Sequence, residues 1–81
     1  MNDEQRRRRV HETDATIRVG KGGVEAVTDE LREQLRDRDL VKVKFLRAAR
    51  GGTDTEGLAS ALAEAAGVEL IETRGHTATY R

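Results

Sequence analysis

The amino-acid sequence predicts an α/β domain with the element order (α)βαβαββ, a small mixed four-stranded sheet packed by helices. Residues 40–46 alternate between apolar and basic side chains, which is typical of a strand with one buried face. Residues 24–37 and 58–66 instead repeat apolar side chains at helical spacing. Two βα crossovers and a terminal hairpin require both parallel and antiparallel pairing. A chain of 81 residues has room for one such domain, which we assign to residues 13–81.

The first half of the domain is predicted to contain a strand, a glycine-rich loop and a helix. The segment 15–19 is short and β-branched, with Ile17 and Val19 on one side of an edge-length strand. It runs into the loop Gly20-Lys21-Gly22-Gly23. An amphipathic helix over residues 24–37 follows, because charged residues separate apolar ones at helical spacing. Those apolar residues are Val24, Val27, Leu31 and Leu35.

The second half begins with the strand over residues 40–46. Its alternation places Lys42 and Lys44 on one face and three apolar residues on the other. The apolar residues are Val41, Val43 and Phe45. Residues 47–57 are then expected to form a flexible loop that is basic at first and polar later.

A second amphipathic helix and a hairpin complete the predicted fold. The helix ends at Gly67, which is typical of a residue just beyond a helix C-terminus. It is marked by Leu58, Ala61, Leu62, Ala65 and Ala66. Residues 68–73 and 77–81 are expected to be strands joined by the two-residue turn Gly75-His76.

The chain has no net formal charge, but its charges are segregated. Residues 40–50 carry a net charge of +4 and residues 1–23 carry +2, whereas residues 24–39 and 51–66 carry −3 each. A folded molecule can therefore have a basic face and an acidic face, and only the basic face would meet phosphates. The sequence has only two aromatic residues, so base stacking is expected to contribute little to any nucleic-acid binding.

The composition disfavours several functional classes. There is no cysteine, and His11 and His76 lie far apart, so we expect neither a metal nor a cofactor. No apolar run approaches the about 20 residues of a membrane span, and no signal-peptide core is present, so we expect a cytoplasmic protein without a membrane partner. We also expect it to be a monomer. The acidic residues Glu25, Asp29 and Glu33 have the spacing of a solvated helix face. Since no nucleophile with a base is indicated, we do not expect an enzyme.

The loop Gly20-Lys21-Gly22-Gly23 is the first candidate binding site. Glycines permit left-handed backbone angles and allow a ligand to approach the main chain closely. The helix that follows would direct N–H groups and its positive dipole end at the loop, and Lys21 adds a formal charge. This combination suits a nucleic-acid phosphate, as in the GXXG loop of KH domains. The alternative is a tight turn whose glycines serve geometry alone.

Two other basic groups are candidates. Lys42 and Lys44 lie about 7 Å apart on one side of a strand, near the spacing of adjacent phosphates, and Arg47 and Arg50 follow directly. A solvated face or a lysine-protected edge is the alternative. Residues 1–12 are expected to be a basic N-terminal arm or a short helix, and either could be a solvated terminus instead of a binding element. Its arginines are Arg6, Arg7, Arg8 and Arg9.

In their order along the chain, these motifs resemble the CRM domain, the YhbY-like RNA-binding family. That pattern has a histidine nine residues before a GxxG loop, as His11 stands before Gly20. The chain departs from it at Ala15, where family members often have a proline. The resemblance covers roughly residues 9–81 and is specific only as an ordered set. The other matching segments are Leu40-Val41-Lys42-Val43-Lys44, Leu62-Ala63-Glu64-Ala65-Ala66-Gly67, Gly75 and Tyr80-Arg81.

The resemblance implies binding to structured RNA, with the GxxG loop and nearby basic residues in contact with the phosphate backbone. It also implies a fold similar to the C-terminal domain of translation initiation factor three. Family members are associated with pre-ribosomal particles and, in plant organelles, with intron splicing. A single-domain chain looks more like the ribosome-associated branch, which implies ribosomal or pre-ribosomal RNA as the partner and a role in ribosome assembly.

The acidic helix leaves a second function open. The chain could be a protein–protein interaction module in which residues 24–37 form the contact surface and the basic loop is incidental. A nucleotide-binding enzyme, the third class, would need affinity for a mononucleotide at the loop of residues 20–23.

Overall fold

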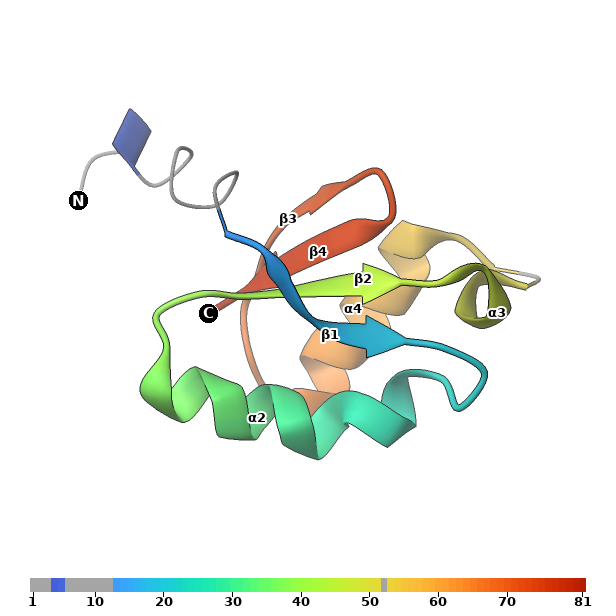
Figure 1. Ribbon diagram of the computed structural model, residues 1–81, viewed down its shortest axis with the longest axis horizontal. Coiled ribbons are helices and arrows are strands. Elements are labelled where there is room, and N and C mark those ends of the chain that lie inside the picture. Colours follow the sequence, from blue (N-terminus) through green and yellow to red (C-terminus); the bar gives the residue numbers. More distant parts are fainter. Residues whose placement is uncertain (1–3, 6–12, 52) are drawn as a thin grey trace.

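A computed structural model describes residues 4–5, 13–51 and 53–81. The four strands form one sheet in the order β1-β2-β4-β3, in which β1 is parallel to β2 and the other pairs are antiparallel. The predicted α/β class, the βαβαββ order of residues 13–81 and the mixed four-stranded sheet are confirmed (Figure 1). In chain order the elements are β1 (Ala15–Val19), the 3-10 segment η1 (Val24–Val27), α2 (Thr28–Asp37), β2 (Val41–Phe45), α3 (Arg47–Arg50), α4 (Thr55–Ala66), β3 (Leu70–Arg74) and β4 (Thr77–Tyr80).

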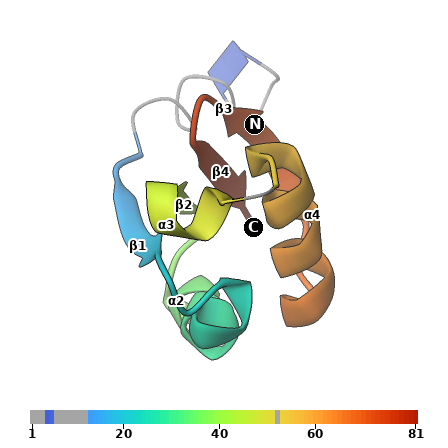
Figure 2. The ribbon, with the colours of Figure 1, turned by 90° about the vertical axis from the view of Figure 1, so that its right-hand side faces the viewer.

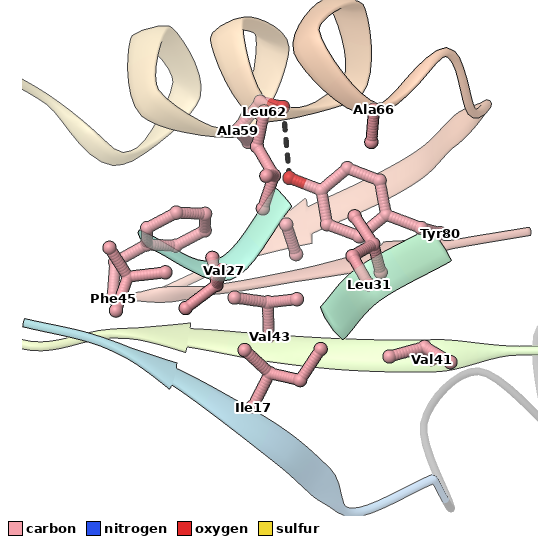
Figure 3. Close-up of a cluster of buried hydrophobic side chains, with 12 residues drawn as sticks. Ile17, Val27, Leu31, Val41, Val43, Phe45, Ala59, Leu62, Ala66 and Tyr80 are labelled. Atoms are coloured by element: carbon pink, nitrogen blue, oxygen red, sulfur yellow. Dashed lines mark hydrogen bonds between the residues drawn. The ribbon is translucent and has the colours of Figure 1, made fainter. Parts of the chain in front are cut away.

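The helices α2 and α4 lie side by side on one face of the sheet, so residues 13–51 and 53–81 are arranged in two layers (Figure 2). The core lies between the layers, and the apolar residues of β1, β2 and β4 point into it (Figure 3), while Leu70 of β3 packs against it. Burial alternates along β2 as predicted, because its three apolar residues are buried while Lys44 is exposed and Lys42 is half-buried. The core consists of Ile17, Val19, Val27, Leu31, Val41, Val43, Phe45, Ala59, Leu62, Ala66, Ala78 and Tyr80.

The segment predicted as one helix over residues 24–37 has two parts. Its first four residues form the 3-10 segment η1, and the α-helix begins only at Thr28. The amide of Ala26 donates to the carbonyl of Gly23 at 3.3 Å, a tighter pairing than an α-helix makes. The apolar spacing is satisfied all the same, because Val27 and Leu31 both reach the core.

The expectation of a flexible loop over residues 47–57 is wrong. Residues Arg47–Arg50 form the short helix α3, and α4 already begins at Thr55. The α3 turn is stabilised by tertiary contacts that a local sequence pattern does not reveal. Its Ala49 packs against the core, and the Arg50 side chain donates from Nε to the carbonyl of Phe45 at 3.1 Å.

The boundaries of α4 follow from local chemistry. The carboxylate of Asp54 accepts a hydrogen bond from the amide of Gly57 at 2.7 Å, which caps the N-terminus. Gly67 ends the helix as predicted, in the left-handed conformation with φ 68°. The phase of the helix differs from expectation, since Ala61 and Ala65 are exposed. The buried residues are Thr55, Ala59, Leu62 and Ala66.

Candidate functional site

One end of the sheet brings together three segments that are far apart in the sequence. Because β1 and β2 are parallel, their C-terminal ends meet, and the turn between β3 and β4 lies at the same end. The amide of Leu46 donates to the carbonyl of Val19 at 2.9 Å, and that of Phe45 donates to the carbonyl of His76 at 2.8 Å. The loop 20–23 and the hairpin turn therefore lie at the same end of the sheet, on either side of the end of β2, from which helix α3 follows (Figure 1). We call this region the loop end of the sheet.

The glycine-rich loop at this end is a tight turn with an exposed lysine. The amide of Gly23 donates to the carbonyl of Gly20 at 3.0 Å, which closes the turn and leaves Lys21 exposed at its tip. Gly23 has φ 73°, a value that side chains disfavour. A Cβ atom on Gly22 would lie 3.1 Å from that of Ala26. The backbone angle requires glycine at Gly23, whereas a side chain at Gly22 needs the exposed Ala26 to shift by a few tenths of an ångström. Both glycines keep the main chain beside Lys21 free of bulk.

The helix dipole acts on the loop less directly than the sequence predicts. The segment between the loop and α2 is the four-residue η1, so the α-helix N-terminus stands one turn beyond Gly23. The positive charge at the loop therefore comes mainly from Lys21 and from basic residues that the fold places nearby.

The four basic residues predicted around β2 have different surroundings. Lys44 and Arg47 are exposed, whereas Lys42 and Arg50 are half-buried. The guanidinium of Arg50 is partly engaged, because its Nε holds the end of β2. Arg50 is thus as much a structural residue of the loop end as a candidate binding residue. Arg6, Arg7, Arg8 and Arg9, like His11, lie outside the described residues.

Two basic residues that sequence reasoning missed lie on the same sheet face as Lys44. Arg18 of β1 is the register partner of Lys44. Thr77 of β4 is the register partner of Lys44 on its other side, and Arg74 of β3 is the register partner of Thr77. Alternation within residues 15–19 already placed Arg18 opposite Ile17 and Val19, but strand register cannot be obtained from one strand alone. Arg74 resembled an ordinary turn residue.

The acidic residues lie mainly on the other layer. On α2, Asp29 forms an ion pair with Arg32, and Glu33 forms one with Arg36 at 3.3 Å, so the helix neutralises part of its own charge. These pairs are exposed and contribute little to stability. Lys44 projects from the sheet face opposite α2, because its neighbour Val43 is buried in the core between the sheet and the helices.

The described residues contain no group of three or more His, Cys, Asp or Glu side chains that could hold a metal ion. Among the same residues, no helix has the length and apolar character needed to cross a membrane. Burial raises the pKa of Tyr80, but this side chain lies in the core and donates from its hydroxyl to the carbonyl of Ala59 at 2.9 Å (Figure 3).

Comparisons with known proteins agree with this fold. A model of the CRS1/YhbY (CRM) domain matches residues 1–81. A protein of Methanocaldococcus jannaschii named as a probable RNA-binding protein is 33% identical over 90 residues, covering 98% of this chain and 67% of its own length. The solution structure of a hypothetical Staphylococcus aureus protein, put forward as RNA-binding, shares 31% identity at a TM-score of 0.72, covering 91% of this chain and 76% of that one. The chain therefore belongs to the CRS1/YhbY (CRM) domain family.

Proposed function

We propose that this protein binds structured RNA by contacting its phosphate backbone with the loop end of the sheet. The observation that carries the proposal is the meeting of Lys21, Lys44 and Arg47 at one end of a molecule whose net charge is zero. Only a surface with segregated charge gives such a molecule a local attraction for phosphates. The names of the two relatives, one a probable RNA-binding protein, support the same class of ligand.

Each group has a separate part in this mechanism. The loop glycines allow a phosphate to approach the main chain, and Lys21 supplies charge there. Lys44 and Arg47 extend the contact, with Lys42 and Arg50 at its margin. Arg6 to Arg9 would add an arm to the same contact. Phe45 and Tyr80, the two aromatic residues, are fully buried, so neither can stack on a base. Recognition would then follow the shape and charge of the RNA.

The RNA that we propose is ribosomal or pre-ribosomal, with a role in ribosome assembly in the cytoplasm. This finer assignment depends on the association of CRM proteins with pre-ribosomal particles. Structured ribosomal RNA is a suitable ligand because double-helical RNA is recognised mostly through its shape, its phosphates and its 2′-hydroxyls. We propose that the protein acts as a monomer and without catalysis.

The direct test is fluorescence anisotropy with labelled ribosomal RNA hairpins across a salt series. The variant Lys21→Ala with Gly22→Asp removes a positive charge and adds a negative one at the loop. We expect binding weaker by about tenfold, which corresponds to about 1.4 kcal/mol. The dependence of log K on log salt should also become shallower by about 0.7 to 0.9 for each phosphate that the variant no longer neutralises.

The matched control is Arg38→Ala with Ser60→Asp. It makes the same change in net charge on exposed residues at the end of α2 and on α4, in the helical layer. We expect nearly wild-type binding from this control. Circular dichroism and thermal melts would check that both variants remain folded. Absence of wild-type binding at low salt, or equal weakening by both variants, would contradict the proposal.

A further inference from the structure

A transverse row of three basic residues and one threonine crosses the four strands of the sheet. Strand register places Arg18, Lys44, Thr77 and Arg74 side by side, from β1 through β2 and β4 to β3. Residues paired in register project to the same face of a sheet. The neighbouring positions Val43 and Ala78 are buried under the helices, so the row projects from the opposite face. We call these four residues the transverse row.

The row is more exposed than the rest of its face. Arg18, Lys44 and Arg74 are all exposed, and Thr77 is half-buried. One step toward the other end of the sheet, the partners of Lys42 are Ala15 and Thr79, and that row also includes Glu72. Thr79 there is only 2% exposed. Accessibility and positive charge therefore both increase toward the loop end.

The charges of the row are available to a ligand. Within the part of the chain that the structure describes, neither Arg18, Lys44 nor Arg74 forms an ion pair. The row contains no acidic residue, and its threonine is held in place by a hydrogen bond from Thr77 Oγ1 to the Arg74 carbonyl at 2.8 Å. Uncompensated arginines and lysines on one exposed line are a surface for which a polyanion is the complementary partner.

The dimensions of the row suit an extended polyanion. Neighbouring strands lie about 4.8 Å apart, so three strand spacings separate the backbones of Arg18 and Arg74 by about 14 Å. Arg18 also lies two residues before Gly20, so the row begins beside the glycine-rich loop. An RNA backbone that contacts Lys21 can therefore continue across the sheet along the basic residues of the row.

We propose that the transverse row is a second phosphate-contacting surface, continuous with the loop, along which the RNA backbone crosses the sheet from β1 to β3. The inference rests on the proposed function and extends it to Arg18 and Arg74. The RNA interface would then include the face of the sheet opposite α2 and α4 as well as the loop. Guanidinium groups at both ends of the row can each hold a phosphate in a bidentate manner.

The test measures salt dependence, because a loss of packing or stability does not change the number of counterions released. Removing two phosphate contacts with Arg18→Gln and Arg74→Gln should lower the slope of log K against log salt by about 1.4 to 1.8. The probe is the labelled ribosomal RNA hairpin. A control, Arg36→Gln with Arg38→Gln, removes two arginines of the helical layer and should leave the slope unchanged.

A charge-preserving variant guards against a folding defect. Arg18→Lys with Arg74→Lys keeps the positive row and should retain most of the wild-type slope. If the glutamine variant keeps the wild-type slope while Lys21→Ala with Gly22→Asp loses part of it, the second surface is overturned and the loop mechanism stands. If the wild type itself does not bind the hairpin, the proposed function fails as well.

Discussion

Tyr80 joins the two layers of the domain through one side chain. It is fully buried, and its hydroxyl donates to the carbonyl of Ala59 in α4 at 2.9 Å. Its partner in β2 is Val41, and Leu31 of α2 belongs to the same core, so the ring lies among residues of three elements (Figure 3). The helix layer is thereby held to the last strand by a polar contact as well as by apolar packing.

We predict that Tyr80→Phe lowers the free energy of unfolding by about 0.5 to 1.5 kcal/mol at pH 7, because the variant cannot make this hydrogen bond. Burial raises the pKa of Tyr80 above the value of about 10 that tyrosine has in an unfolded chain. The unfolded state therefore releases this proton first, so the stabilisation is complete below about pH 10 and declines as the pH rises further. Urea unfolding at several pH values measures it.

The two proteins should therefore converge in stability above about pH 10, where only the wild type can ionise at this position. The comparison with the variant cancels the lysines, which also titrate in this range. A difference in unfolding free energy that stays constant from pH 7 to pH 11 would contradict this explanation.

At single positions, the sequence predicted which face of a strand or helix a side chain occupies, but not which residues of other strands lie beside it. Alternation was sufficient to place Lys42 and Lys44 opposite Val43, because the period of a strand is local. The conformation of Gly67 was likewise predicted from its place after an apolar stripe. The pairing of Arg18 with Lys44 could not be predicted from the sequence. It depends on how two segments 26 residues apart align, and no pattern within either segment fixes that alignment.

Among the elements, those with a sustained period were predicted and the short ones were not. The strand β1 was predicted with its observed bounds, Ala15–Val19. Helix α3 has four residues, too few for a helical period, and it forms because Ala49 and Arg50 find partners in the folded core and at the end of β2. In α4 the abundance of alanine left the phase ambiguous, and tertiary packing selected Ala59 over Ala61.

The acidic helix distinguishes the proposed function from an interaction module. We predict that Glu25→Gln, Asp29→Asn and Glu33→Gln together leave RNA affinity unchanged or raise it slightly. The carboxylates of Asp29 and Glu33 belong to the layer behind the sheet, so removing them reduces only a distant repulsion. Glu25 lies two residues beyond the loop, so its removal accounts for any gain in affinity. The same anisotropy titration measures this outcome, with Lys21→Ala as the comparison. A marked loss of RNA binding would show that the helix takes part in recognition.

For the whole molecule, the two layers separate the charge that the sequence had segregated only along the chain. The helical layer carries the acidic α2, and the sheet layer carries the transverse row and the loop end. A net charge of zero therefore coexists with a strongly basic surface. The sequence indicated that the basic segments could converge, but only the parallel pairing of β1 with β2 and the position of the β3–β4 turn determine where they meet.

The most direct test of RNA binding at the basic end of the sheet maps the contact on the unmodified protein. Isotope-labelled protein would be titrated with an unlabelled ribosomal RNA hairpin at low salt, and backbone amide shifts would be followed by NMR. We predict that the largest changes occur in residues 20–23 and in the transverse row, while the amides of α2 from Thr28 to Asp37 change little. The largest changes on α2, or no change at either surface, would contradict the proposal that the basic end of the sheet binds RNA.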